Sequence, residues 1–80
     1  MQAPHMSLLL PQTRSGTVRS ARIVEIHGDR YVDLVVALDA ADPPGASGRV
    51  SATECPTDLA IGERVTVRFT MGVMTRVKRE

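Results

Sequence analysis

Short segments in which apolar side chains occupy every second position recur along this chain, and they constrain its fold more than any other feature. The clearest is residues 31–38, where four apolar side chains alternate with a mixed set. Period-two patterning is typical of a β-strand with one buried face. The same pattern occurs in three later segments, residues 48–54, 63–70 and 73–78. The sequence therefore predicts an all-β fold.

Residues 16–27 form a further predicted strand, rich in valine and isoleucine, whose alternation slips between Ser20 and Arg22. A β-bulge there would explain the slip, and the resulting bend allows one long strand to join both halves of a closing sheet. Gly28 and Asp29 follow, and glycine in the first position suits a type II′ hairpin turn. We therefore expect the first two strands to form a hairpin.

Three segments are expected to lie outside the strands. Residues 40–47 contain two prolines and a glycine, which favour a protruding loop because proline cannot donate to a ladder. Residues 57–62 begin with capping-type residues and end in glycine, which is typical of one helical turn. Residues 1–12 are expected to be flexible and partly derived from cloning, so that the domain spans residues 13–80.

The segment LAIGERVTVRF leads into the fourth strand, after a short helical turn that separates it from the third. This arrangement of five strands resembles an OB-fold domain, closest to the small initiation-factor and cold-shock barrels, over residues 16–79. The resemblance implies a five-stranded OB-type barrel in which the first strand lies beside the fourth and the fifth beside the third. An SH3-like barrel is the alternative.

The residues that usually carry chemistry show no constellation in this sequence. Cys55 is the only cysteine, which excludes an internal disulfide and a paired-cysteine metal site and favours the cytoplasm. His27 has no second ligand or base at a useful spacing, and the acidic residues lack the spacing of a metal loop. No apolar run is long enough to span a membrane. We expect a non-enzymatic protein without metal or cofactor.

Charge is unevenly distributed along the chain, although its net value is only +1. Residues 13–22 carry +3, residues 23–63 carry −6, and residues 64–80 carry +4. The OB arrangement would place the arginines of the first strand near those of the fourth. A shared basic surface of this kind favours phosphate groups, and a solvated outer face is the alternative explanation.

The resemblance implies a ligand surface across the second and third strands, where OB domains bind oligonucleotides. Tyr31 would stack on a base there, or else pack against the end of the barrel. We predict a non-catalytic module for single-stranded DNA or RNA. The predicted contact residues are Arg19, Arg22, Tyr31, Arg49, Arg64, Arg68, Arg76, Lys78 and Arg79.

A protein-interaction or self-assembling barrel is the second hypothesis. Val35, Met71 and Met74 are predicted to face outward, and methionine side chains adapt readily to a partner surface. The separated charges would also allow head-to-tail docking between subunits. The partner would then be another protein or a second copy of this chain.

Overall fold

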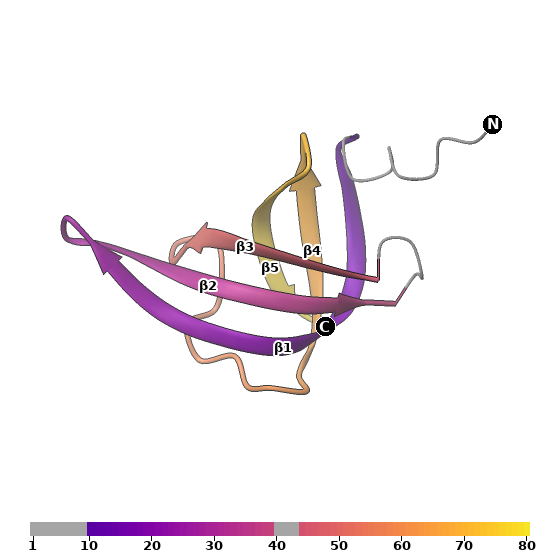
Figure 1. The fold of residues 1–80 in the computed structure, drawn as a ribbon, viewed down its shortest axis with the longest axis horizontal. Coiled ribbons are helices and arrows are strands. Elements are labelled where there is room, and N and C mark those ends of the chain that lie inside the picture. The colour runs from indigo at the N-terminus through magenta and orange to yellow at the C-terminus, as the bar shows by residue number, and fades with distance from the viewer. Residues whose placement is uncertain (1–9, 40–43) are drawn as a thin grey trace.

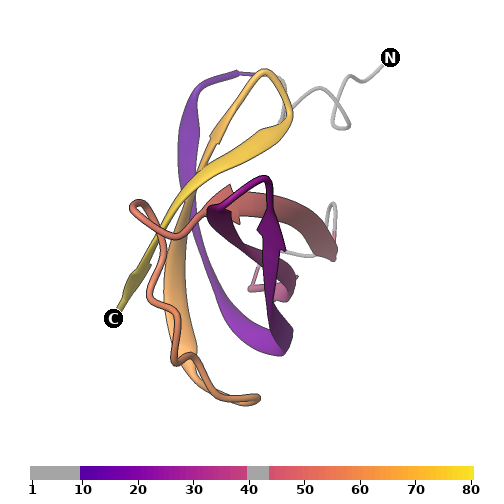
Figure 2. The same ribbon diagram turned by 90° about the vertical axis from the view of Figure 1, so that its left-hand side faces the viewer.

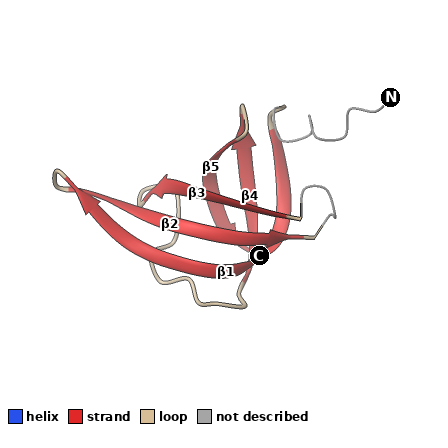
Figure 3. Ribbon diagram, viewed as in Figure 1, coloured by secondary structure: helices blue, strands red, loops and turns tan. Residues whose placement is uncertain are grey.

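The computed structural model describes residues 10–39 and 44–80, in which five antiparallel strands form one sheet (Figures 1 and 3). The strands are β1 (Gln12–Ile26), β2 (Asp29–Leu38), β3 (Gly45–Ser51), β4 (Arg64–Thr70) and β5 (Val73–Arg79). Their order across the sheet is β3-β2-β1-β4-β5. The predicted all-β fold is thereby confirmed. None of the described residues belongs to a helix that could cross a membrane.

The long strand β1 belongs to both halves of the sheet. Residues 12–17 pair with β4, and residues 16–26 pair with β2. The register against β2 shifts between Val18 and Ser20, so the expected bulge is present but lies slightly before its predicted position. Figure 2 shows β1 curving from the half that contains β4 and β5 into the half that contains β2 and β3.

The core lies between these two halves, because the sheet folds over onto itself. Phe69 and Leu34 are the largest of its fully buried side chains, and most of the others are valines from alternate strand positions. The two edge strands, β3 and β5, contact each other without being paired. At this contact a Cβ atom on Gly48 would lie 2.9 Å from Met74 Cβ. The sheet is therefore curved and compact but not closed.

The two-residue turns between β1 and β2 and between β4 and β5 each use a non-glycine residue at positive φ. His27 and Gly28 have φ values of 51° and 84°, and Met71 and Gly72 have values of 55° and 78°. Positive φ at both central residues defines a type I′ turn, whose twist matches that of the flanking strands. The predicted turn at Gly28 and Asp29 was wrong by one residue, because Asp29 is already paired with Ile26.

The helical turn predicted in residues 57–62 is not present, and the chain there forms a bend at Thr57 and a turn at Ile61 and Gly62. The backbone amides of this loop bond to groups other than helical carbonyls. Gly62 N donates to Val18 O at 2.8 Å, and Ala60 N donates to Glu63 Oε1 at 3.0 Å. Bonds to β1 and to a side chain thus replace the helical pattern.

Strand β3 begins earlier than the sequence suggests. Gly45 pairs with Ala37, and the last three residues of the predicted 40–47 loop belong to the strand. Pro44 precedes the strand and still contributes to the sheet, because its carbonyl accepts a hydrogen bond from Leu38 N at 2.9 Å. The rest of the predicted loop, residues 40–43, lies outside the described residues, as does most of the predicted flexible N-terminal segment.

A second bulge changes which residues of β5 face the core. Arg68 pairs with Arg76, whereas Phe69 pairs with Met74, so Thr75 is an extra residue in the strand. Met74 is consequently 3% exposed, and Val73 is 58% exposed. The prediction that Met74 faces outward was wrong, because strict alternation cannot show a bulge. Met74 also leaves the exposed surface proposed for a protein partner.

Gly16 lies where β1 has partners on both sides, and a side chain would not fit there. A Cβ atom would lie 2.5 Å from both Ala37 O and Val36 Cγ1. We expect Gly16→Ala to lower the free energy of unfolding by about 1–3 kcal/mol, the usual range for overpacking. Urea unfolding measures this loss, and Ser15→Ala is the neighbouring control. An increase in stability, which glycine-to-alanine changes give at unstrained sites, would contradict this packing.

Candidate functional site

The outer face of β1, β2 and β3 carries three rows of side chains that cross the strands. Directly paired residues of an antiparallel sheet place their side chains on the same side. The middle row is charged and contains Arg22, Asp33 and Arg49. The rows beside it contain Val24, Tyr31 and Ser51 on one side and Ser20, Val35 and Ser47 on the other. Neighbouring rows are about 6.6–6.8 Å apart along a strand.

A hollow of about 670 Å³ lies over this face. Its lining includes the charged row and the row that contains Val35, together with Gly48. The side chain of Val35 is outward and 41% exposed, and Tyr31 is half-buried in the row beyond. The hollow is thus lined by cations and aliphatic carbon, and the Tyr31 ring lies in the next row outside its lining.

Within the charged row, Asp33 holds Arg49 by two hydrogen bonds. Arg49 Nε donates to Oδ1 at 2.7 Å, and Nη2 donates to Oδ2 at 2.9 Å. These bonds, helped by the charges of Arg49 and Arg22, hold the pKa of Asp33 below its ordinary value. Asp33 is therefore ionised at neutral pH, and the row has one positive charge in excess. Arg22 has no ion pair among the described residues.

The basic residues of β1 and β4 do not form the single row that the sequence suggested. Arg64 and Arg68 lie opposite Thr17 and Thr13 of β1, whereas Arg22 lies opposite Asp33 of β2. The reason is that β1 leaves β4 after Thr17 and continues only along β2. Arg19 is exposed at the bulge between these two regions.

Several of the predicted contact residues form ion pairs within the molecule. Arg64 donates to Asp39 from Nη1 at 2.7 Å and lies 3.5 Å from Glu80 through Nε. Arg76 Nε lies 2.7 Å from Glu54 Oε1. Acidic residues of the segment 23–63 thus neutralise arginines of the segment 64–80. Much of the opposite charge of these two segments is therefore paired inside the folded molecule.

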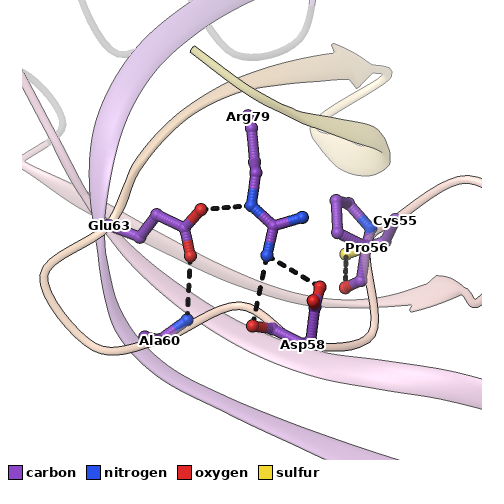
Figure 4. A network of polar contacts seen from close by, with 6 residues as sticks. All are labelled: Cys55, Pro56, Asp58, Ala60, Glu63 and Arg79. Atoms are coloured by element: carbon purple, nitrogen blue, oxygen red, sulfur yellow. Dashed lines mark hydrogen bonds and ion pairs between the residues drawn. The ribbon is translucent and has the colours of Figure 1, made fainter.

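Arg79 is the centre of a network that attaches the loop between β3 and β4 to β5 (Figure 4). Its Nη2 donates to Asp58 Oδ1 at 2.7 Å and to Asp58 O at 3.2 Å, and its Nε donates to Glu63 Oε2. Arg79 lowers the pKa of Asp58. The hydrogen bond from the Ala60 amide lowers the pKa of the Glu63 carboxyl most, and the hydrogen bond from Arg79 lowers it further. These contacts give Arg79 a structural role.

The lone thiol is poorly suited to chemistry. Cys55 is 5% exposed, and its Sγ lies 3.3 Å from Pro56 O. Burial raises the pKa of the Cys55 thiol to about 11, so the reactive thiolate is scarce at neutral pH. Among residues 10–39 and 44–80, no three histidine, cysteine, aspartate or glutamate side chains are grouped as a metal site would require.

The sequence placed Tyr31 and Arg49 on this face but did not identify the partner of Arg49. Alternation in β2 shows that Asp33 shares a face with Tyr31. The missing information was the register between β2 and β3, which sets Asp33 opposite Arg49. Val24 and Ser20 were missed for the same reason, because the β1 bulge determines which face they occupy.

We expect Cys55 to react very slowly with a disulfide reagent in the native protein and rapidly in urea. The physical reason is its burial together with its raised thiol pKa. Absorbance of the released thiolate at about pH 8 measures the two rates. Equal rates in buffer and in denaturant would show that the thiol is accessible, contrary to the structure.

We expect Arg79→Gln to lower the melting temperature of the protein at neutral pH. The difference in melting temperature from the unmodified chain should become smaller at acidic pH. Asp58 and Glu63 have lowered pKa values in the folded protein, so their ionised forms stabilise the fold at pH values above the pKa of the unfolded chain, which is about 4. This contribution is lost as the pH falls through the lower folded values. Thermal unfolding between neutral and acidic pH measures the difference.

The matched control for that experiment is Arg19→Gln, which removes an exposed arginine without an ion pair in the described part of the chain. Its effect on the melting temperature should be small and should not depend on pH in the acidic range. A pH-independent loss in Arg79→Gln would show that the carboxylates are not its partners.

Comparison with known proteins gives no relative on which to base a function. No family model matches the chain, and no curated protein or solved structure shows significant similarity to it.

Proposed function

We propose that the protein binds single-stranded DNA or RNA, without catalysis, on the outer face of β1, β2 and β3. The observation that carries this proposal is the hollow over the charged row. Arg22 is available there beside the fixed Arg49, with Tyr31 in the adjoining row. Phosphate, base and sugar each find a suitable group on this surface.

The strand arrangement supports an OB-type barrel as the architecture behind this surface. β1 lies beside β4, and β3 contacts β5, which is the arrangement that the resemblance implies. OB barrels are commonly only partly closed, and they bind oligonucleotides on the face of their second and third strands. The proposed site occupies the equivalent face. The free cysteine favours a reducing compartment, for which we propose the cytoplasm.

Arg22 and Tyr31 would have different roles in binding. The Arg22 guanidinium would pair with phosphate, giving affinity that falls with salt. The Tyr31 ring would stack on an unpaired base, which contributes about 1–3 kcal/mol. Asp33 fixes the direction of Arg49 and at the same time reduces the net charge of the face. We therefore expect binding that is weak, salt-dependent and selective for unpaired strands.

A fluorescent oligothymidine of about twelve nucleotides tests the site by anisotropy at about 50 mM and about 200 mM salt. We expect Arg22→Ala to weaken binding and to reduce the slope of log affinity against log salt by about 0.7, the value for one phosphate contact. Arg30→Ala is the control, because Arg30 is exposed but alternates onto the other face of the same hairpin. It should change binding much less.

Equal effects of Arg22→Ala and Arg30→Ala would contradict a site on this face. Absence of oligonucleotide binding at low salt would remove the proposal altogether. If the mass measured by light scattering also rose with protein concentration, the self-assembling alternative would be favoured. Val35 and Met71, which are 41% and 75% exposed, would then be the residues to substitute first.

A further inference from the structure

The outer face of the other half of the sheet carries a second cluster of cations. One row that crosses β1, β4 and β5 contains Thr13, Arg68 and Arg76. The adjacent row contains Ser15, Thr66 and Lys78. Three cations and three hydroxyl groups are thus neighbours on one surface. None of the six residues is acidic.

This arrangement places like charges directly opposite each other. Arg68 and Arg76 are cross-strand partners, and such pairs destabilise a sheet when no counter-ion is present. Glu54 pairs with Arg76 through Nε at 2.7 Å. Arg68 and Lys78 form no ion pair with any residue that the structure describes. The cluster therefore keeps an excess of positive charge.

A hollow of about 280 Å³ lies within the cluster. The residues that line it are all hydroxyl-bearing or cationic, namely Thr13, Thr66, Arg68, Arg76 and Lys78. Guanidinium groups present a fork of N–H donors that matches the oxygens of phosphate, and an ammonium adds a compact charge. The Thr13 hydroxyl can donate to a further oxygen, whereas the Thr66 hydroxyl donates to Glu80 Oε2 at 3.4 Å. The depression has the donors that a multiply charged oxyanion requires.

We propose that this cluster is a phosphate-binding site, separate from the surface of β1, β2 and β3. Its ligand is a phosphate group, either in a soluble polyphosphate or in a nucleic-acid backbone. Arg68 and Lys78 provide the uncompensated charge, and Arg76 contributes the donors that Glu54 leaves unused. The site does not depend on Arg22 or Tyr31, which belong to the hairpin of β1 and β2.

Protection of a sheet edge is the competing explanation for these charges. β5 is an edge strand, and charged side chains on edges prevent pairing with other chains. Edge protection accounts for Arg76 and Lys78. It does not account for Arg68, which is on the interior strand β4, or for the hydroxyl groups that complete the hollow. Anion binding accounts for all of them.

Titration of the 15N-labelled protein with tripolyphosphate, at constant ionic strength, tests the site by nuclear magnetic resonance. We expect saturable shifts of the backbone amides of Thr66, Arg68 and Lys78. The double substitution Arg68→Gln with Lys78→Gln should weaken binding by about tenfold or more, because charged hydrogen bonds are lost. The control Arg30→Gln should bind like the unmodified chain. Unchanged spectra away from β4 and β5 establish that each variant is folded.

Titrations with two different ligands distinguish the possible sources of the phosphate group. Shifts at the same amides with oligothymidine, abolished by the double substitution, would identify a nucleic-acid backbone. Shifts with tripolyphosphate alone would identify a soluble polyphosphate. Arg22→Ala should leave tripolyphosphate binding unchanged. The proposal for this site and the proposal for the nucleic-acid site can therefore be refuted separately.

Two results would overturn the inference. One is a non-saturating response that chloride reproduces at the same ionic strength. The other is retention of binding by the double variant. If that variant instead self-associates and the unmodified chain binds no phosphate, edge protection is the function of these charges.

Discussion

Gly16 and Thr17 of β1 pair with β2 on one side and with β4 on the other, and this shared stretch holds the two halves of the sheet together. The lack of a side chain at Gly16 permits the close approach of Val36 and Ala37. The bulge after Val18 then directs the rest of β1 along β2 alone. One core and two separate outer faces follow from this single strand, and each of the two proposed sites lies on one of those faces.

Ion pairing decides which cations of those faces remain available. Side chains from the acidic middle of the sequence pair with arginines of β3, β4 and β5, as in the bidentate contact between Asp33 and Arg49. Pairs of this kind at an exposed surface contribute little stability individually. Their larger effect is on the electrostatic surface, because Arg22 on one outer face and Arg68 and Lys78 on the other have no ion pair with any described residue.

The alternation of apolar residues was enough to locate all five strands and most of the core, because burial of one face imposes a period of two. It could not locate bulges, which depend on how two strands fit together. This is why Met74 was expected at the surface and is buried beside Gly48. The register between neighbouring strands also could not be predicted from the alternation. This register places Asp33 opposite Arg49 and keeps Arg22 away from Arg68.

The contact between β3 and β5 lacks the ladder of backbone hydrogen bonds that joins each pair of neighbouring strands in the described sheet. Beside it, Val77 N donates to Glu54 O at 2.9 Å, just beyond the end of β3. A seam of this kind can open with the loss of few bonds, whereas separation at β1 would break whole ladders. Any change in the angle between the β2–β3 and β4–β5 arms would therefore take place about β1, and burial of the core that both arms share limits its extent.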